Sequence, residues 1–260
     1  MDIKVPQLFE AHDISLDFSI ESDEIVQVIK PCSFSVPKGL ITIIYGASGS
    51  GKSSLLNILS GLQAPTHGEL NYNGKNVYEK TTDELAYFRA VELGIVYQTN
   101  YWVKSLSVRE NVCLPQYFLG KSRHQAHQTA EAVLDRIGMK KHSKKRPTLL
   151  SGGEQQRIAM ARAIINDSAV IIADEPTGNL DSISGDMIIN LLSELQNNDG
   201  KTIILVTHNM EYLPFAHHLI NVQDGNITEI SKKDIPKTIH DMLQSAQDRI
   251  ASLISRGASR

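Results

Sequence analysis

The sequence predicts an α/β domain in which a mostly parallel sheet carries helices on its faces. Apolar, β-branched runs alternate along the chain with segments whose apolar residues recur at helical spacing, and this alternation is typical of parallel sheets. In addition, residues 46–53 read Gly-Ala-Ser-Gly-Ser-Gly-Lys-Ser, the G-x-x-x-x-G-K-[ST] pattern of a phosphate-binding loop. An apolar run at 40–45 precedes this loop and a helical pattern at 54–59 follows it, so the motif has the strand-loop-helix context that it needs.

Composition indicates an ordinary globular protein. Hydrophobic residues make up 41% of the 260 residues, enough for a sizeable core in one large domain or two small ones. The net charge of −3 gives no reason to expect nucleic acid as a partner. Cys32 and Cys113 lack metal or redox spacing, so we expect free thiols in a reducing compartment. With no signal-peptide core and no stretch near the ~20 apolar residues that span a bilayer, we expect a protein that is soluble or held at a membrane by a partner.

The first half of the chain reads mainly as strands. Asn73-Gly74 is a hairpin signal, and Pro37-Lys38-Gly39 is a turn into the strand before the phosphate loop. Residues 82–89 have the pattern of a capped helix. The expected strands of this half are residues 8–18, 24–36, 40–45, 69–72 and 94–98.

The second half becomes helical and then returns to alternation. Ser107 and Glu110 form a capping box that opens one helix, and Asp224-Gly225 is the turn of a final hairpin over 219–230. Further helices are expected at 125–137, 151–165 and 182–197, strands at 169–173 and 202–207, and a helical tail from residue 234.

The phosphate-binding loop carries the first candidate site. Its three glycines let the backbone curl so that successive N–H groups point at an anion, and the helix that follows adds its positive N-terminal end. We expect Lys52 to reach the β- and γ-phosphates and the Ser53 hydroxyl to ligate Mg²⁺. An ordinary glycine turn is the alternative, which the complete motif disfavours. The residues expected to bind the nucleotide here are Gly46, Ala47, Ser48, Gly49, Ser50, Gly51, Lys52, Ser53 and Ser54.

Two adjacent carboxylates follow the apolar run at 170–173. Neighbouring side chains of a strand point to opposite sides, so Asp174 and Glu175 can take different roles at the strand end. We expect Asp174 to hold the water shell of Mg²⁺ and Glu175 to act as the general base toward the attacking water. A polar strand end without function is the alternative.

A second anion site is predicted about 100 residues further along the chain. Residues 150–157 read Leu-Ser-Gly-Gly-Glu-Gln-Gln-Arg, in which Ser151 and Glu154 make a capping box and Gly152 and Gly153 expose N–H groups at a helix start.

With these motifs in this order, the chain resembles the nucleotide-binding subunit of ABC transporters over residues 9–230. The resemblance implies a P-loop NTPase fold of the ABC ATPase type, with a mostly parallel sheet core, an antiparallel β subdomain and a helical subdomain. It also implies that Ser151, Gly152, Gly153 and Glu154, the signature motif, bind the γ-phosphate held by the phosphate loop of a second copy.

The resemblance assigns roles to four further positions. Phe18 is similar to the aromatic residue that stacks on adenine, with Phe in place of the usual Tyr. Gln98 resembles the glutamine that contacts Mg²⁺ and the attacking water. Asp181 ends an Asn-Leu-Asp segment that resembles the loop crossing the dimer interface, and it is expected to contact the nucleotide there. His208 resembles the histidine that contacts the γ-phosphate.

The resemblance also suggests a division of the chain and a subgroup. We expect one ABC ATPase domain, with an ATP-binding core at 1–98 and 167–232, a helical signature subdomain at 99–166 and a C-terminal helical extension at 233–260. Residues 46–53 and 173–181 are similar to the lipoprotein-release, macrolide-export and cell-division group, in which Glu154 is a tolerated variant of the usual Gln. Residues 98–115, where the family meets its membrane subunit, depart more from the pattern.

The expected function is ATP hydrolysis in a homodimer that drives a separate integral membrane permease, on the cytoplasmic face of the cell membrane, with ATP and Mg²⁺ as cofactors and no nucleic acid. One alternative is a soluble ABC-type ATPase acting on nucleic acid or ribosomes. Such proteins usually carry two ATPase units, a coiled-coil insertion or zinc modules, none of which this sequence shows. A P-loop kinase is a second alternative, but it would leave residues 151–154 unexplained.

For three features the sequence allows two interpretations each. The basic run 140–146 suits a solvated loop or a contact with anionic lipid. Trp102 suits either a partner contact or a core position. The apolar spacing of the C-terminal helix suits packing on its own domain or on a second copy.

Overall fold

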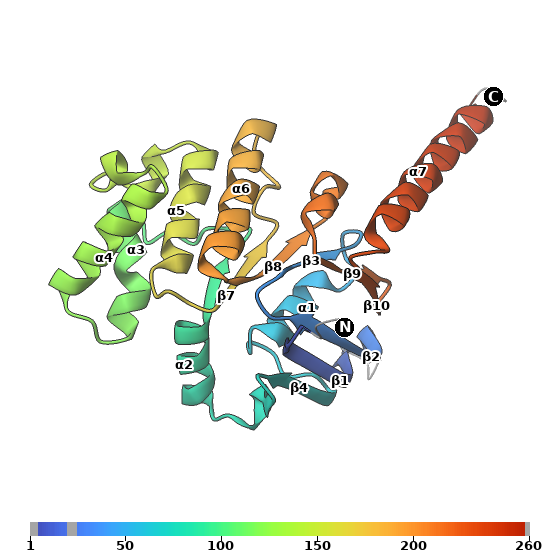
Figure 1. Ribbon diagram of the computed structural model, residues 1–260, viewed down its shortest axis with the longest axis horizontal. Coiled ribbons are helices and arrows are strands. Elements are labelled where there is room, and N and C mark those ends of the chain that lie inside the picture. The colour runs from blue at the N-terminus through green and yellow to red at the C-terminus, as the bar shows by residue number, and fades with distance from the viewer. Residues whose placement is uncertain (1–4, 20–24, 258–260) are drawn as a thin grey trace.

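The computed structural model describes residues 5–19 and 25–257, and it folds them into two sheets with helices around them (Figure 1). The larger sheet has the strand order β10-β9-β3-β8-β7-β6. Neighbours from β9 to β6 run parallel, and β10 pairs antiparallel with β9 at the edge. Its strands are β3 (Ile41–Tyr45), β6 (Leu93–Val96), β7 (Val170–Asp174), β8 (Thr202–Thr207), β9 (His218–Gln223) and β10 (Asn226–Ser231). The predicted fold class is confirmed.

The smaller sheet is antiparallel and has the order β2-β1-β4-β5. Its short β4–β5 hairpin turns at Asn73 and Gly74, which have φ values of +48° and +74°. Both residues therefore adopt the left-handed conformation that a tight hairpin turn needs. The strands are β1 (Gln7–Ser19), β2 (Ile25–Pro37), β4 (His67–Tyr72) and β5 (Lys75–Asn76). Glu24, at the start of the second expected strand, and residues 258–260 of the expected C-terminal extension lie outside the described residues.

The large sheet separates two hydrophobic clusters, and alternate residues of one strand enter different clusters. In β8, Ile203 and Leu205 pack toward α3–α6, whereas Ile204 and Val206 pack toward α1 and the small sheet. All six residues of β8 are buried because both faces of the sheet are covered. This sandwiching explains why the central strands read as continuous apolar runs in the sequence.

The helices between β6 and β7 form a separate group on one side of the large sheet (Figure 1). They are α3 (Val108–Phe118), α4 (Arg123–Arg136) and α5 (Gly152–Ile164), and α6 (Ser182–Asp199) lies beside them. Capping boxes at Ser107, Ser122 and Ser151 start α3, α4 and α5, since each serine accepts from the third helical N–H and each third side chain accepts from the serine N–H.

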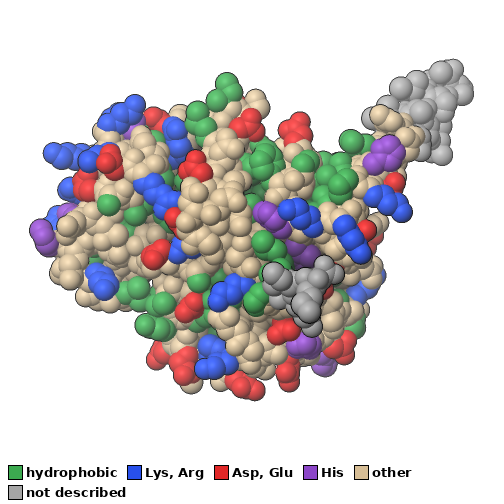
Figure 2. All heavy atoms as spheres, in the orientation of Figure 1, with side chains coloured by type: hydrophobic (Ala, Val, Ile, Leu, Met, Phe, Trp, Pro, Cys, Tyr) green, Lys and Arg blue, Asp and Glu red, His purple; other side chains and the backbone are tan. Residues whose placement is uncertain are grey.

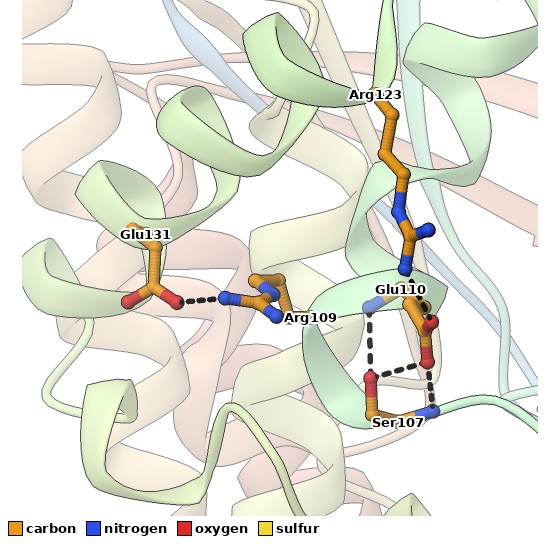
Figure 3. Close-up of polar contacts among 5 residues, drawn as sticks. All are labelled: Ser107, Arg109, Glu110, Arg123 and Glu131. Atoms are coloured by element: carbon orange, nitrogen blue, oxygen red, sulfur yellow. Dashed lines mark hydrogen bonds and ion pairs between the residues drawn. The ribbon is translucent and has the colours of Figure 1, made fainter.

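Two ion pairs join α3 to α4 (Figure 3). Arg109 Nη1 lies 3.0 Å from Glu131 Oε1, and Arg123 Nη2 lies 3.8 Å from Glu110, the residue that closes the capping box of α3. Both pairs are partly exposed, so they orient the two helices more than they stabilise them.

The remaining helices connect or extend the two sheets. α1 (Lys52–Leu59) follows the phosphate loop, and α2 (Thr82–Glu92) is capped by Thr81. α7 (Ile235–Gly257) projects from the body (Figure 1), but Ile235 is buried, and Ile239 and Met242 pack on the main core. The start of α7 thus packs on its own domain. Short 3₁₀ turns lie at Val77–Glu79, Lys140–His142, Pro147–Leu149 and Met210–Phe215.

Within the described residues, none of the helices has both the length and the apolar character needed to cross a bilayer.

Candidate nucleotide-binding site

The phosphate loop joins β3 to α1 in a conformation that requires glycine at two positions. Gly46 has φ +158°, and a Cβ there would lie 2.1 Å from the carbonyl oxygen of Val222. Gly51 has φ +108°, and its Cβ would lie 3.0 Å from the carbonyl oxygen of Val28. Within α1, all of which the structure describes, the N-terminus has no side-chain cap and no acidic residue in its first turn. The first N–H groups are therefore available to an anion.

Two polar groups of this loop fit a phosphate. Lys52 is buried, and its Nζ donates to the carbonyl oxygens of Gly46 at 2.9 Å and Ala47 at 2.8 Å, which folds its side chain back over the loop. The hydroxyl of Ser50 is buried without a hydrogen-bond partner in the described part of the chain. Unpartnered buried polar groups are rare in proteins, and a phosphate oxygen is a suitable partner for this one.

A cleft of about 560 Å³ gathers most of the predicted site residues around the loop. It brings together residues from segments that are far apart in sequence: the predicted general base, the residues predicted to bind Mg²⁺ and the histidine predicted to contact the γ-phosphate. The lining residues are Val28, Ala47, Ser48, Gly49, Gly51, Lys52, Ser53, Ser54, Gln98, Asp174, Glu175 and His208. Sequence reasoning missed Val28, because an apolar residue in β2 carries no local signal for a place beside the phosphate loop.

Asp174 is the last residue of β7 and faces this cleft half-buried. Burial raises its pKa, the neighbouring Glu175 charge raises it further, and Lys52 opposes both. A cation bound in the cleft would favour the ionised form of this carboxylate.

Glu175 lies beyond the strand, in a left-handed conformation with φ +44°. The expectation that strand alternation separates it from Asp174 is therefore wrong, since β7 ends at Asp174. Its N–H donates to the carbonyl of Val206 at 2.9 Å, which anchors the turned backbone on β8. Its carboxylate is 11% exposed, and Oε1 lies 2.9 Å from Nδ1 of His208. A non-glycine residue held at positive φ is a recurrent feature of functional sites.

Gln98 lies two residues past the end of β6 at Val96, so the expected strand over 94–98 is two residues too long. Its side chain faces the cleft from a loop. Trp102, further along this loop, donates from Nε1 to Oε1 of Gln155 at 2.8 Å, and the guanidinium of Arg162 lies 4.6 Å from its ring centre. Trp102 thus packs within its own chain, against α5.

Phe18 does not line the cleft. It lies near the end of β1, paired with Val26 of β2, and its side chain is 42% exposed. Its contact with adenine stays a prediction, because the cleft described above is formed around the phosphate loop and Phe18 lies outside it.

The signature motif starts α5, and none of its four residues lines the cleft of the same chain. The N–H of Ser151 donates to Oε2 of Glu154 at 2.9 Å, and the N–H of Glu154 donates to Oγ of Ser151 at 3.3 Å. A Cβ on Gly153 would lie 2.7 Å from Oγ of Ser184, so only glycine lets α5 start this close to α6.

Asp181, which was predicted to contact nucleotide, caps α6. Its Oδ1 accepts from the N–H of Ser184 and its Oδ2 accepts from the Ser184 hydroxyl, both at 2.9 Å. Because Ser184 also touches Gly153, the start of α6 and the signature motif are neighbours. Asp181 and the signature therefore form a second surface, apart from the cleft that holds the phosphate loop.

Comparisons with known sequences agree with this geometry. The family model described as ABC transporter matches residues 29–178, more than half of the chain. The pyoverdine export ATP-binding/permease protein of Pseudomonas entomophila is 39% identical over 96% of this chain and 38% of its own length. The macrolide export ATP-binding/permease protein of Mannheimia succiniciproducens is 39% identical over 82% of this chain and 33% of its own length. The chain spans less than two fifths of these relatives.

Solved structures lead to the same family. A bacterial ABC transporter cassette described as dimeric superimposes with a TM-score of 0.80 at 33% identity, covering 86% of this chain and 98% of that one. A dimeric post-hydrolysis state of that ATP-binding cassette, bound to ADP and Pi, matches with the same TM-score and identity. The chain therefore belongs to the ABC transporter family, in which it is an ATP-binding cassette and an ABC ATPase.

Proposed function

We propose that this chain hydrolyses ATP in a dimer of two copies and drives a separate membrane permease. One observation carries the proposal. The cleft gathers the phosphate loop, Glu175 and His208, while the signature motif of the same chain lies on another surface. A complete site of this kind then needs the signature motif of a second copy.

Within the cleft, the loop N–H groups and Lys52 bind the phosphates. Ser53 and Gln98 would supply oxygen ligands for Mg²⁺, and Asp174 would hold its water shell. Mg²⁺ usually keeps several waters and takes few protein ligands besides phosphate oxygens, which fits this oxygen-only set. Mg²⁺ held by these residues would supply positive charge against the charge that develops on the transferred phosphoryl group. Burial raises the pKa of Asp174, and a cation bound beside this carboxylate would lower that pKa again by favouring the ionised form.

Glu175 acts as the general base in this proposal. Its mostly buried carboxylate is held by the anchored backbone on one side and by His208 on the other. It accepts a proton from water that attacks the γ-phosphorus in line, and Lys52 and His208 stabilise the charge on the phosphate oxygens. The His208 side chain is 64% exposed, which leaves it free to contact the γ-phosphate from the open side of the cleft.

The second copy contributes Ser151, Gly152, Gly153 and Glu154 to each ATP site. The N–H groups at the start of α5 bind the γ-phosphate across the interface, and Asp181 lies beside them at the start of α6. The similar cassette described as dimeric supports this assembly. ATP is then part of the interface, so hydrolysis weakens it.

The membrane partner is proposed to bind a groove of about 740 Å³ between α2, α3 and α5. Tyr87, Tyr101 and Phe118 line this groove with 65%, 71% and 82% of their surfaces exposed. Exposed aromatic clusters of this kind mark partner surfaces. Relatives named as ATP-binding/permease proteins of export systems support an exporter permease as this partner, on the inner face of the cell membrane.

A single preparation tests these proposals. We would measure ATP hydrolysis by the purified chain and its ATP-dependent dimerisation. We would also measure whether a membrane protein is recovered with the chain from detergent extracts. Phe118→Asp should abolish recovery of the membrane protein and leave dimerisation intact. Leu62→Asp, which changes an exposed leucine outside the groove, is the matched control and should retain the partner. The permease proposal would be contradicted if the unaltered chain and Phe118→Asp both dimerise and neither is recovered with a membrane protein.

A further inference from the structure

His142 lies between α4 and α5, and its imidazole is buried against the signature motif. Nε2 lies 3.2 Å from Oε1 of Glu154, and the His142 side chain is only 9% exposed. Both ring nitrogens are buried, and neither makes a hydrogen bond within the described residues. Buried ring nitrogens without hydrogen bonds are unfavourable. The Glu154 carboxylate, 3.2 Å from Nε2, is a group that would stabilise a proton on this imidazole.

Glu154 is in an unusual electrostatic position at the third residue of α5. One of its oxygens, Oε2, closes the capping box with Ser151, and the other faces His142. A carboxylate is favourable at a helix N-terminus, but so is a phosphate, and the two compete for the same positive end. The charge of Glu154 therefore opposes phosphate binding at this helix start unless a neighbouring cation compensates it.

Other charged groups near His142 make it a weak base. Burial lowers the pKa of the His142 imidazole, and Lys145, Lys141 and Arg157 lower it further, whereas Glu154 raises it. The lysines belong to the exposed basic connection before α5, in the region where Figure 2 shows Lys and Arg side chains gathered beyond α4. Together these effects hold the pKa of His142 below the usual value for histidine, which favours the uncharged imidazole at neutral pH.

We propose that His142 is a positioning residue for the signature motif, which sets the net charge that Glu154 presents at the start of α5. This inference rests on the proposed composite ATP site. With His142 uncharged, the full charge of Glu154 acts at the helix start that binds the γ-phosphate of the other copy. With His142 protonated, the imidazolium 3.2 Å away compensates that charge, so the ATP-bound dimer becomes tighter as the pH falls through the His142 pKa.

The test measures the dimer dissociation constant by sedimentation with ATP–Mg²⁺ between about pH 8 and about pH 5.5, the range in which a histidine titrates. All variants carry Glu175→Gln so that ATP stays uncleaved. With His142 present, we expect dimerisation to tighten by about fivefold at the acid end, the size of effect typical for a charge at a helix terminus. Titration of ATP and of other groups contributes equally to every variant.

Three substitutions separate the role of His142 from general effects of pH. His142→Gln should remove the additional acid tightening. His142→Arg should be tight across the range because its charge does not titrate. Glu154→Gln should be tight already at neutral pH and should respond less to acid, because it removes both the charge that opposes the phosphate and the carboxylate that raises the pKa of His142. His218→Gln is the matched control. It removes another imidazole, half-buried, that lies 2.9 Å from a glutamate, Glu229, on a different part of the fold, and it should keep the full pH response.

Each outcome has a defined meaning. If Glu154→Gln or His142→Gln shows the same pH response as His218→Gln, the inference is overturned while the composite site stands. Thermal melts identify variants that fail to fold, and Glu154→Gln still decides the question if His142→Gln is among them. If none of the variants forms ATP-dependent dimers at any pH, the composite site itself is overturned, and this inference with it.

Discussion

His208 and Glu175 are 33 positions apart in sequence, yet Nδ1 of the imidazole lies 2.9 Å from Oε1 of the carboxylate. The contact arises because β7 and β8 are adjacent parallel strands and both residues follow the ends of these strands. The proposed base and the imidazole proposed to contact phosphate are thereby placed at the carboxyl ends of adjacent strands, next to the phosphate loop.

Glu175→Gln should leave ATP binding nearly unchanged and slow hydrolysis by about 100-fold or more, because an amide does not accept the proton of the attacking water. Phosphate release and nucleotide titration measure the two effects separately. Glu194→Gln, an exposed substitution on α6, is the control and should behave as the unaltered chain. Hydrolysis by Glu175→Gln at the unaltered rate would show that another group is the base.

Gly46→Ala should destabilise the fold and abolish ATP binding, since its Cβ would lie 2.1 Å from the backbone oxygen of Val222. We expect a loss of roughly 3 kcal/mol in the free energy of unfolding. Gly49→Ala is the informative comparison, because its φ is +79° but its Cβ would meet nothing within 4 Å. It should lose only about 1 kcal/mol, from backbone strain. Denaturant titrations measure both, and equal losses would refute the steric explanation.

Phe18→Ala should weaken nucleotide binding by about 1 kcal/mol if this ring stacks on adenine. Titration with fluorescent ATP measures the change, and Phe18→Tyr should retain the affinity. Ile25→Ala removes a 68% exposed side chain from the neighbouring strand and serves as control. Unchanged affinity in Phe18→Ala would mean that the base is bound elsewhere.

Ser151→Arg should prevent ATP-dependent dimerisation, because the longer cation fills the anion site at the start of α5 and removes the capping hydroxyl. In the Glu175→Gln background, ATP–Mg²⁺ should shift the chain from monomer toward dimer by mass action, and the added Ser151→Arg should abolish that shift. Sedimentation gives the result, and a circular dichroism melt checks that the single chain still folds. An ATP-induced dimer that persists with Ser151→Arg would refute the composite site.

Local signals in the sequence were sufficient for several helix starts and turns. Capping boxes at Ser107 and Ser151, and the turns at Asn73-Gly74 and Asp224-Gly225, were predicted and are present. Each depends on hydrogen bonds or φ angles within four residues, so the chain encodes it without help from distant contacts. The motif that identified the phosphate loop is local for the same reason, because glycine conformations and a helix N-terminus make the anion site.

Contacts between distant segments decided the rest. The order β3-β8-β7-β6 places Lys52, His208, Asp174 and Gln98 around one cleft, and residue spacing along the chain carries no information about that order. The left-handed backbone of Glu175 and the approach of His142 to Glu154 were likewise unforeseen. The packing of the partly buried Trp102 on α5 is the core position that the sequence had left open beside a partner contact. Each results from packing between segments, which local propensity does not specify. The sequence alone therefore identified the chemistry of the groups, and the tertiary structure determined which of those groups can act together.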